Sequence, residues 1–448
     1  MCKGPDDNVT VHTVKEVGQH KKLSDLWVVI EGKVYDLSKW ALKHPGGLKP
    51  LIHTAGKDAT VLFNGFHPSR VKKMLAPLCI GTVAKTEMPV TKRIEELRQK
   101  LVDEGFFSTD RSFYQWYAVR LIALFSLCLS LTLWSKSVYW KLLGAIFLGL
   151  FWHQGMLLGH DLCHNSVNGR KLDYFIAQML VSLFGISSSW WKASHNNHHI
   201  VTNAVEHDAD IQHLPFFVVD SEYFKSIWST WHKRIMDFDD FSNLMVRNQA
   251  VLFYPIMMVA RVYLYIQSVV YLATGRISER RGFEIASFSL FYVWFPALIC
   301  QLPTWGTMAA YFFISHAVAG ILHVQICISH FPMPTYMNME MENDSEAFFK
   351  TQLVTSLDVT CPWYMDWFHG GLQFQVEHHL FPHIPRHNLR KVQPIIKEFC
   401  EEMGWKHHSV SFFEANRMVV NHLYEVSKKT PNMRFTDTKL YDLLCARG

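Results

Sequence analysis

The chain has 448 residues, of which 49% are hydrophobic, 14% aromatic and 19% charged. This composition is too apolar for an ordinary soluble protein and too polar for a bundle of membrane helices alone, so it indicates a mixed architecture, part aqueous and part membrane-embedded. The formal net charge of +5 comes without a concentrated basic stripe, which favours a surface facing anionic lipid over a nucleic-acid binder.

The metal-binding capacity of the chain lies in its 25 histidines. The nine cysteines include no Cys-x-x-Cys pair, so we expect neither a zinc ribbon nor a disulfide framework. The first residues, MCKGPDDNV, contain no apolar signal region, so we expect the start of the chain to lie in the cytosol.

Residues 1–85 are predicted to form a soluble domain, because charged residues are frequent and the apolar stretches 26–30 and 33–37 are typical of short strands. Residues 86–112 are predicted to be a linker with an amphipathic helix. Its apolar residues recur at helical spacing: Ile94, Leu97, Leu101, Val102 and Phe106. The pattern leaves two options open, a helix on a membrane surface and an ordinary solvated linker.

Residues 113–448 are predicted to form a membrane domain. An 18-residue helix is about 27 Å long, close to the thickness of the hydrocarbon core. Four apolar runs approach or exceed this length: 117–134, 142–159, 285–302 and 305–327. Two further stretches, 172–191 and 250–273, are predicted to be interfacial or half-inserted helices, since Arg261 in the second is costly in lipid.

The loops between these runs indicate the orientation. The turns 135–138 and 302–305 are short and nearly uncharged, whereas the segments 160–284 and 328–448 carry most of the remaining Lys and Arg. By the positive-inside rule the long segments face the cytosol, and the four spans form two hairpins that enter the membrane from that side.

His44, in the string His-Pro-Gly-Gly, and His67, 23 residues later, form the first histidine constellation. Two histidines from separate loops can bind a haem iron from opposite sides, and such a six-coordinate haem transfers electrons. The glycines Gly46 and Gly47 would let the backbone turn tightly beside the porphyrin. By itself the string is a turn as often as it is a ligand.

Neighbouring motifs strengthen the haem interpretation. They are Trp27, the stretch 33–37, Trp40, the run Ala-Gly-Lys-Asp-Ala at 55–59, and Ile80-Gly81. Together these residues resemble cytochrome b5 over residues 10–83, which implies a haem b held by His44 and His67. His53, between them, is expected at the surface.

Three histidine boxes form the second constellation: His160-Asp-Leu-Cys-His164, His195-Asn-Asn-His198-His199 and Gln375-Val-Glu-His378-His379. Histidines three or four apart share one face of a helix. Imidazole ligands favour iron, copper or zinc over magnesium or calcium. Counting the spans places all three boxes on one side of the membrane, the side of the N-terminal domain, so a single metal site can collect them.

The boxes resemble those of membrane fatty-acyl desaturases. The glutamine that begins the third box, together with the cytochrome b5-like start, resembles the front-end subgroup, and the stretch DWFHGGLQFQVEHHLFP at 366–382 is especially specific. The resemblance covers residues 10–425. Asp208-Ala209-Asp210 departs from it, because many relatives have Asp-Pro-Asp there.

The resemblance implies a fold and a ligand set. The fold is an α+β cytochrome b5-like domain, then an all-α membrane desaturase domain with about four transmembrane helices and a cytosolic histidine-rich cap. The implied cofactor is a di-iron centre held by seven box histidines: His160, His164, His195, His198, His199, His378 and His379. His330 is the best extra ligand, and His323 is possible. Gln375 is expected to bind weakly or to hold a water.

Other polar residues near the boxes are expected to support the ligands. Asp161, Asp210 and Glu377 are expected to orient imidazole N–H groups, and His316 to be a hydrogen-bonded core residue. The remaining histidines of this region are expected to lie behind the ligands or at the surface: His207, His213, His369, His383 and His387.

The resemblance also implies the reaction, the oxygen-dependent insertion of a double bond into a lipid chain. Electrons would reach the fused haem from NADH through a separate cytochrome b5 reductase, since the chain has no Gly-x-Gly-x-x-Gly fingerprint after a strand. We expect an enzyme of the endoplasmic reticulum membrane, closest in appearance to Δ8 desaturases of the sphingolipid long-chain base. The alternatives are a front-end Δ6 or Δ5 fatty-acyl desaturase and, more distantly, a lipid hydroxylase or a non-catalytic haem membrane protein.

Overall fold

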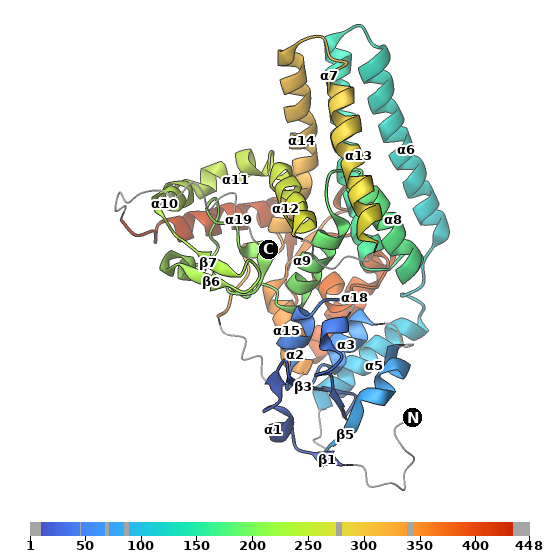
Figure 1. Cartoon of the computed structure of the whole chain (residues 1–448), viewed down its shortest axis with the longest axis vertical. Coiled ribbons are helices and arrows are strands. Elements are labelled where there is room, and N and C mark those ends of the chain that lie inside the picture. The colour runs from blue at the N-terminus through green and yellow to red at the C-terminus, as the bar shows by residue number, and fades with distance from the viewer. Residues whose placement is uncertain are drawn as a thin grey trace.

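The computed structural model describes residues 10–44, 46–67, 71–84, 89–274, 280–337 and 345–432. The molecule is elongated, with a small N-terminal domain at one end, a bundle of long helices at the other, and a layer of shorter helices between them (Figure 1). A side lobe extends from this middle layer.

The N-terminal domain is built on a five-stranded mixed sheet of order β1-β5-β4-β3-β2. Its strands are β1 (Val11–His12), β2 (Lys21–Lys22), β3 (Asp25–Ile30), β4 (Lys33–Asp36) and β5 (Cys79–Val83). Within its described residues the domain also contains short α-helices and 3-10 turns: α1 (Val14–Val17), η1 (Ala41–Lys43), α2 (Lys49–Thr54), α3 (Thr60–Phe66), α4 (Lys72–Leu75) and η3 (Ala76–Leu78). The predicted α+β character of this domain is confirmed.

The linker helix is α5 (Pro89–Asp103). Its apolar face is buried, and Ile94, Leu97 and Leu101 lie in one core with Phe349 and Leu380 from the distant C-terminal half of the chain. Protein covers this face, so neither a membrane-surface helix nor a solvated linker describes it. The pattern gave the apolar face correctly, but a pattern cannot tell lipid from protein as the covering medium.

Among the residues that the structure describes, four helices are long and apolar enough to cross a membrane: α6 (Arg111–Trp134), α7 (Val138–Cys163), α13 (Arg281–Ile299) and α14 (Trp305–Cys327). They match the four predicted runs. The short turns within the pairs α6–α7 and α13–α14 lie at the end of the bundle away from the N-terminal domain (Figure 1). At Gly149 the helices α7 and α14 approach so closely that a Cβ would sit 2.6 Å from the Cβ of Val318.

The two doubtful apolar stretches form shorter helices, and their predicted interfacial or half-inserted place in the membrane stays a prediction. The first contains α8 (Arg170–Ser182) and the start of α9 (Ser188–Ile200), and the second contains α11 (Gln249–Met257) and α12 (Arg261–Ala273), which bend by 71° at the break between them. Arg261 is buried in protein, where it donates to the Phe184 carbonyl and to the Tyr265 hydroxyl, both at 2.8 Å. These bonds and the ring of Trp152, 4.6 Å away, satisfy a charge that lipid could not.

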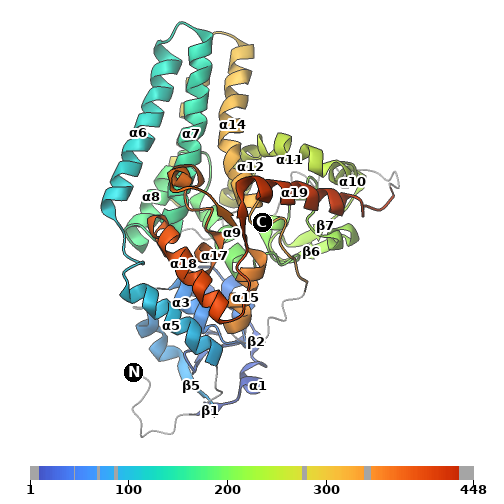
Figure 2. The same cartoon turned by 180° about the vertical axis from the view of Figure 1, so that it is seen from behind.

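The layer between the bundle and the N-terminal domain forms a cap. Besides α8 and α9 it contains α15 (Ser345–Thr355), α16 (Asp366–His369), α17 (Gln375–Leu380) and α18 (Arg386–Glu402), whereas α10 (Asp240–Arg247) and α19 (Phe412–Ser427) join α11 in the side lobe (Figure 2). Two small sheets interrupt this otherwise helical domain, β6 (Ile227–Ser229) with β7 (Arg234–Met236), and β8 (Asp358–Thr360) with β9 (Ser409–Ser411). Short 3-10 turns complete it: η4 (Ala209–Ile211), η5 (Ser221–Lys225) and η6 (Trp363–Met365).

Candidate metal centre

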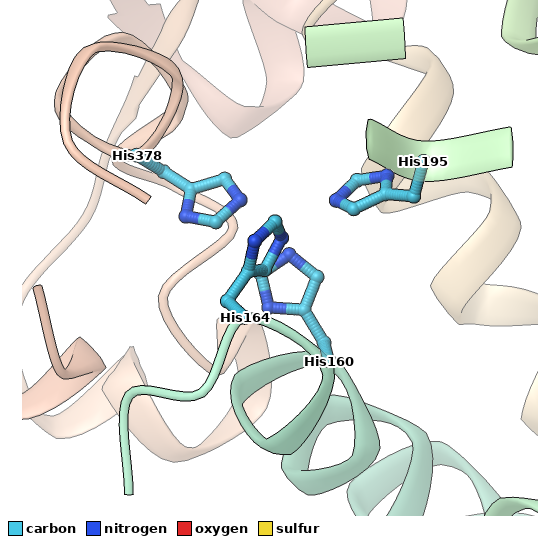
Figure 3. Close-up of side chains that lie close together, drawn as sticks. All are labelled: His160, His164, His195 and His378. Atoms are coloured by element: carbon cyan, nitrogen blue, oxygen red, sulfur yellow. The ribbon is translucent and has the colours of Figure 1, made fainter. Parts of the chain in front are cut away.

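The histidine boxes lie on three helices that meet beneath the membrane bundle. His160 lies in the last turn of α7, and His164 caps that helix. The second box lies on α9 and the third on α17. Figure 3 shows the rings of His160, His164, His195 and His378 directed toward a common centre from these helices.

A first cluster consists of His160, His164, His195 and His378, whose ligand nitrogens lie within 4.8 Å of one another. Nitrogens bound to one metal are up to about 4 Å apart, since a metal–imidazole bond is about 2 Å long. The cluster therefore needs only small side-chain shifts to hold one ion.

A second cluster consists of His198, His330 and His379, again with ligand nitrogens within 4.8 Å. His199 lies between the clusters, because its ring centroid is 4.7 Å from that of His378 and 4.2 Å from that of His379. The arrangement can hold two ions side by side. It includes His330, which follows α14 and belongs to no box.

Several of these rings carry a buried nitrogen without a hydrogen-bond partner among the residues that the structure describes. They are Nε2 of His160, His164, His378 and His379, and Nδ1 of His199. Buried polar atoms are almost always paired, and leaving one unpaired costs about 1–3 kcal/mol. So many unpaired imidazole nitrogens facing one another fit a bound metal, which would satisfy them.

Most of the cluster is electrically neutral. Burial, followed by the neighbouring imidazoles, lowers the pKa of His164, His199, His378 and His379 well below the ordinary value. Burial likewise lowers the pKa of His195 and of His330 to about 3. Neutral imidazole is the form that binds metal, so these rings need not lose a proton first.

His198 is the exception. Burial works against its charged form, but the charges of Asp208 and Asp210 outweigh burial and raise its pKa to about 9. Its Nδ1 donates to Asp208 Oδ2 at 2.8 Å, which directs Nε2 toward the second cluster. Such a carboxylate fixes the ring of a metal-binding histidine and increases its basicity.

The orienting groups are partly those expected and partly others. Asp210, expected in this role, lies 3.9 Å from the Nδ1 atoms of His195 and His198. Asp208 is therefore the closer partner of His198, while Asp210 is the carboxylate beside His195. In the second cluster, His379 Nδ1 lies 2.9 Å from Gln352 Oε1, and His330 Nδ1 lies 3.1 Å from the backbone carbonyl of residue 355. Nothing in the sequence marked these groups, because they are distant along the chain.

Asp161 fulfils its expected role only in part. Its Oδ1 is 3.4 Å from His160 Nδ1, while its Oδ2 accepts from Arg386 Nε at 2.5 Å and from the Tyr114 hydroxyl at 2.7 Å. Asp161 therefore joins the end of α7 to the start of α18 as well as holding a box histidine.

The expectation that Glu377 orients a box imidazole is wrong. Glu377 Oε1 is 2.9 Å from His407 Nε2, and Asp358 lies in the same buried group. Asp358 Oδ1 also accepts from the backbone N–H of Val376, at the start of α17. This group therefore contacts α17 at the Glu377 side chain and at the Val376 N–H, outside both histidine clusters.

The remaining predicted residues lie outside both clusters. Gln375 is buried at the start of α17, and its Oε1 has no partner within the described ranges. His323 belongs to neither cluster. His316 lies 3.1 Å from the Tyr265 hydroxyl and 2.8 Å from the Phe312 carbonyl oxygen, as expected of a core residue.

The histidines expected behind the ligands or at the surface do contact other groups. His207 lies against Thr230, His213 against the carbonyl of Asp210, His383 against the carbonyl of His164, and His387 against the N–H of Asp110, while His369 is buried. His53, expected at the surface, is half-buried, and its ring lies 5.1 Å from that of His207.

His44 and His67 face each other in the N-terminal domain, with ring centroids 6.0 Å apart. His44 Nδ1 donates to the Gly47 carbonyl at 2.7 Å and His67 Nδ1 to the Phe63 carbonyl at 3.1 Å, which leaves the lone pair of each ring on Nε2. A Cβ on Gly46 would lie 2.8 Å from the His44 ring, so glycine is required there. This separation would let both imidazoles bind one haem iron between them.

The fold and the two sets of histidines define a haem-fused membrane oxidoreductase. Comparison of the sequence agrees, because residues 13–84 match the model of the cytochrome b5-like heme/steroid binding domain and residues 137–411 match that of fatty acid desaturases. The chain belongs to the fatty acid desaturase family and carries a cytochrome b5-like domain at its N-terminal side.

Curated relatives align over most of the chain. Delta(8)-fatty-acid desaturase 2 of Arabidopsis thaliana is 36% identical, covering 90% of this chain and 90% of the relative. Delta 8-(E)-sphingolipid desaturase of Kluyveromyces lactis is 37% identical over 91% of both chains. Acyl-lipid (9-3)-desaturase of Borago officinalis is 36% identical over 92% of both.

Asp208 lies 2.8 Å and Asp210 3.9 Å from His198 Nδ1, and this difference leads to a first prediction. We expect Asp208→Asn to lower iron affinity or activity about 10–100-fold, because an uncharged amide holds the His198 ring less firmly. Asp210→Asn is the matched comparison and should have the smaller effect. Iron analysis and product formation of the two purified variants measure this, and a larger loss in Asp210→Asn would contradict the assignment.

Proposed function

We propose that this desaturase contains a di-iron centre and inserts a double bond at carbon 8 of a sphingolipid long-chain base. The observation that carries the di-iron proposal is the pair of adjacent buried histidine clusters at the end of a four-helix membrane bundle. The names of relatives that align over nine-tenths of the chain support the position and the substrate.

One iron would be held by the first cluster and the other by the second, with His199 between them. Bound iron supplies the oxygen-dependent oxidation that no side chain can perform on an unactivated methylene. In the overall reaction, two hydrogens leave adjacent carbons, and these, with two electrons and two protons from the donor, reduce one O2 to two waters. The chain's own residues hold the ligands neutral, fix their orientation and bury them away from bulk water.

The haem b between His44 and His67 would deliver the electrons one at a time. Fusion gives this donor a millimolar-scale effective concentration at the metal centre. A separate NADH-cytochrome b5 reductase would reduce the haem. We place the enzyme in the endoplasmic reticulum membrane with its cap, haem domain and termini in the cytosol, which the short, nearly uncharged turns at the opposite end of the bundle support.

Lipid analysis of a yeast strain that lacks the activity and expresses this chain tests the substrate. We expect sphingoid bases unsaturated at carbon 8, detected by mass spectrometry of hydrolysed sphingolipids beside total fatty-acid methyl esters. A new Δ6 or Δ5 bond confined to fatty acids would overturn the substrate while leaving the desaturase intact, and a hydroxylated product would indicate a hydroxylase.

A further inference from the structure

The haem domain is docked on the cap through the segment that carries a haem ligand. α3, which ends at Phe66 directly before His67, packs against α15, and the backbone N–H of Val61 donates to Ser345 Oγ at 3.2 Å. At Gly65 a Cβ would sit 3.4 Å from the carbonyl oxygen of Leu380, the last residue of α17. The helix leading to one haem ligand therefore lies against the helix that carries two metal-cluster histidines.

Further contacts fix this docking. From α5, Glu95 accepts from the Asn64 amide at 2.7 Å and Arg98 donates to the Asn64 carbonyl at 3.1 Å. On α2, the Lys49 ammonium lies 4.0 Å from the centre of the Trp231 ring. Because polar and apolar contacts hold α3 from several sides, its position relative to the cap is defined.

Two residues join the haem side to the metal side at this contact. His383, just after the third box, has Nε2 2.7 Å from the Phe66 carbonyl oxygen and Nδ1 2.5 Å from the His164 carbonyl oxygen. A neutral imidazole carries one N–H and donates to one of these carbonyls at a time. The ring of Phe66 lies edge-on to that of His199, with centroids 5.8 Å apart.

We propose that Phe66 and His383 form the junction through which electrons pass from the haem to the metal centre. One route runs from the His67 ring through its backbone to the Phe66 carbonyl, across the His383 ring, and into His164. The other runs from Phe66 through its ring to His199. Tunnelling through bonded and closely packed atoms is faster than across a gap, and each route ends on a histidine of the metal site. The inference rests on the proposed function, since it assigns these residues to its electron supply.

The test follows haem re-oxidation in the full-length protein loaded with haem and iron. Haem reduced under anaerobic conditions by NADH and cytochrome b5 reductase is mixed with oxygen and lipid substrate, and its absorbance is recorded by stopped flow. Because the two routes run in parallel and each single variant interrupts only one, we expect Phe66→Leu and His383→Leu each to slow re-oxidation about twofold and the double variant to slow it roughly tenfold. The haem spectrum, the haem midpoint potential and the iron content should equal those of the wild type, which distinguishes lost electron transfer from lost structure.

Two controls make the outcome decisive. His53→Ala removes a ring from the same interface without touching either route and should re-oxidise at the wild-type rate; slowing equal to that of the junction variants would overturn the proposal in favour of docking alone. His378→Ala gives the background rate of a protein with a damaged metal centre. Wild-type re-oxidation no faster than this background would contradict the proposed function itself. A wild-type rate in the double variant would overturn the junction while leaving the proposed function intact. If His383→Leu lost haem or iron, His383→Gln would replace it.

Discussion

His330→Ala is expected to abolish desaturation and to lower the non-haem iron content, although His330 belongs to no histidine box. Its ring completes the second cluster with His198 and His379, and centroid separations of 4.6 and 4.8 Å join it to these two rings. Removing His330 leaves the second cluster with two imidazole ligands, which bind a metal far more weakly than three. We therefore expect activity to fall at least about 100-fold.

The matched control is His323→Ala. His323 lies seven residues earlier on the side of α14 that leads to His330, and the sequence alone allowed either as the extra ligand. Because His323 is outside both clusters, its variant should retain two non-haem irons and activity. On the same preparations, elemental analysis measures total iron, haem quantification gives the haem share of it, and a product assay gives the activity. Full iron and activity in His330→Ala would remove His330 from the centre, and one iron per wild-type chain would refute the di-iron proposal.

Features that depend on short-range patterns could be predicted from the sequence. Helical spacing placed His160 beside His164 and His195 beside His199, because side chains four residues apart share a face, and their ring centroids are 4.7 and 4.6 Å apart. Hydropathy gave the membrane helices for a similar reason, since burial in lipid requires an unbroken apolar run. The span predicted at 305–327 coincides with α14.

Features that depend on which distant segments meet could not be predicted. Asp208 and Asp210 are two residues apart and chemically alike, and only the three-dimensional path of the loop places Asp208 at hydrogen-bonding distance from His198. His407 lies 30 residues from Glu377, so its contact with this carboxylate has no local signal. The contact between His383 and Phe66 spans 317 residues and exists only because the haem domain folds back onto the cap.

His67→Ala is expected to remove the low-spin haem signal and with it the activity supported by NADH and reductase. In the proposed haem site His67 would supply one of the two imidazole ligands, and its Nδ1 bond to the Phe63 carbonyl holds the ring facing His44. A haem bound there would lose one of its two protein ligands in the variant, and with it the low-spin state of a simple electron carrier. The metal-cluster histidines are untouched, so the two non-haem irons should remain.

Absorbance and electron paramagnetic resonance spectra of the haem, non-haem iron content and product yield together measure this separation. His53→Ala provides the comparison, because this ring lies in the same domain and faces His207 of the cap instead of His44. It should keep the low-spin spectrum and the activity.

Free cytochrome b5 added in excess should restore little turnover to His67→Ala, because the docked haem domain occupies the surface beside α17 that a second donor would need. Full recovery with free cytochrome b5 would show that the metal centre accepts electrons from another surface, whereas an unchanged low-spin spectrum in His67→Ala would refute the axial-ligand assignment.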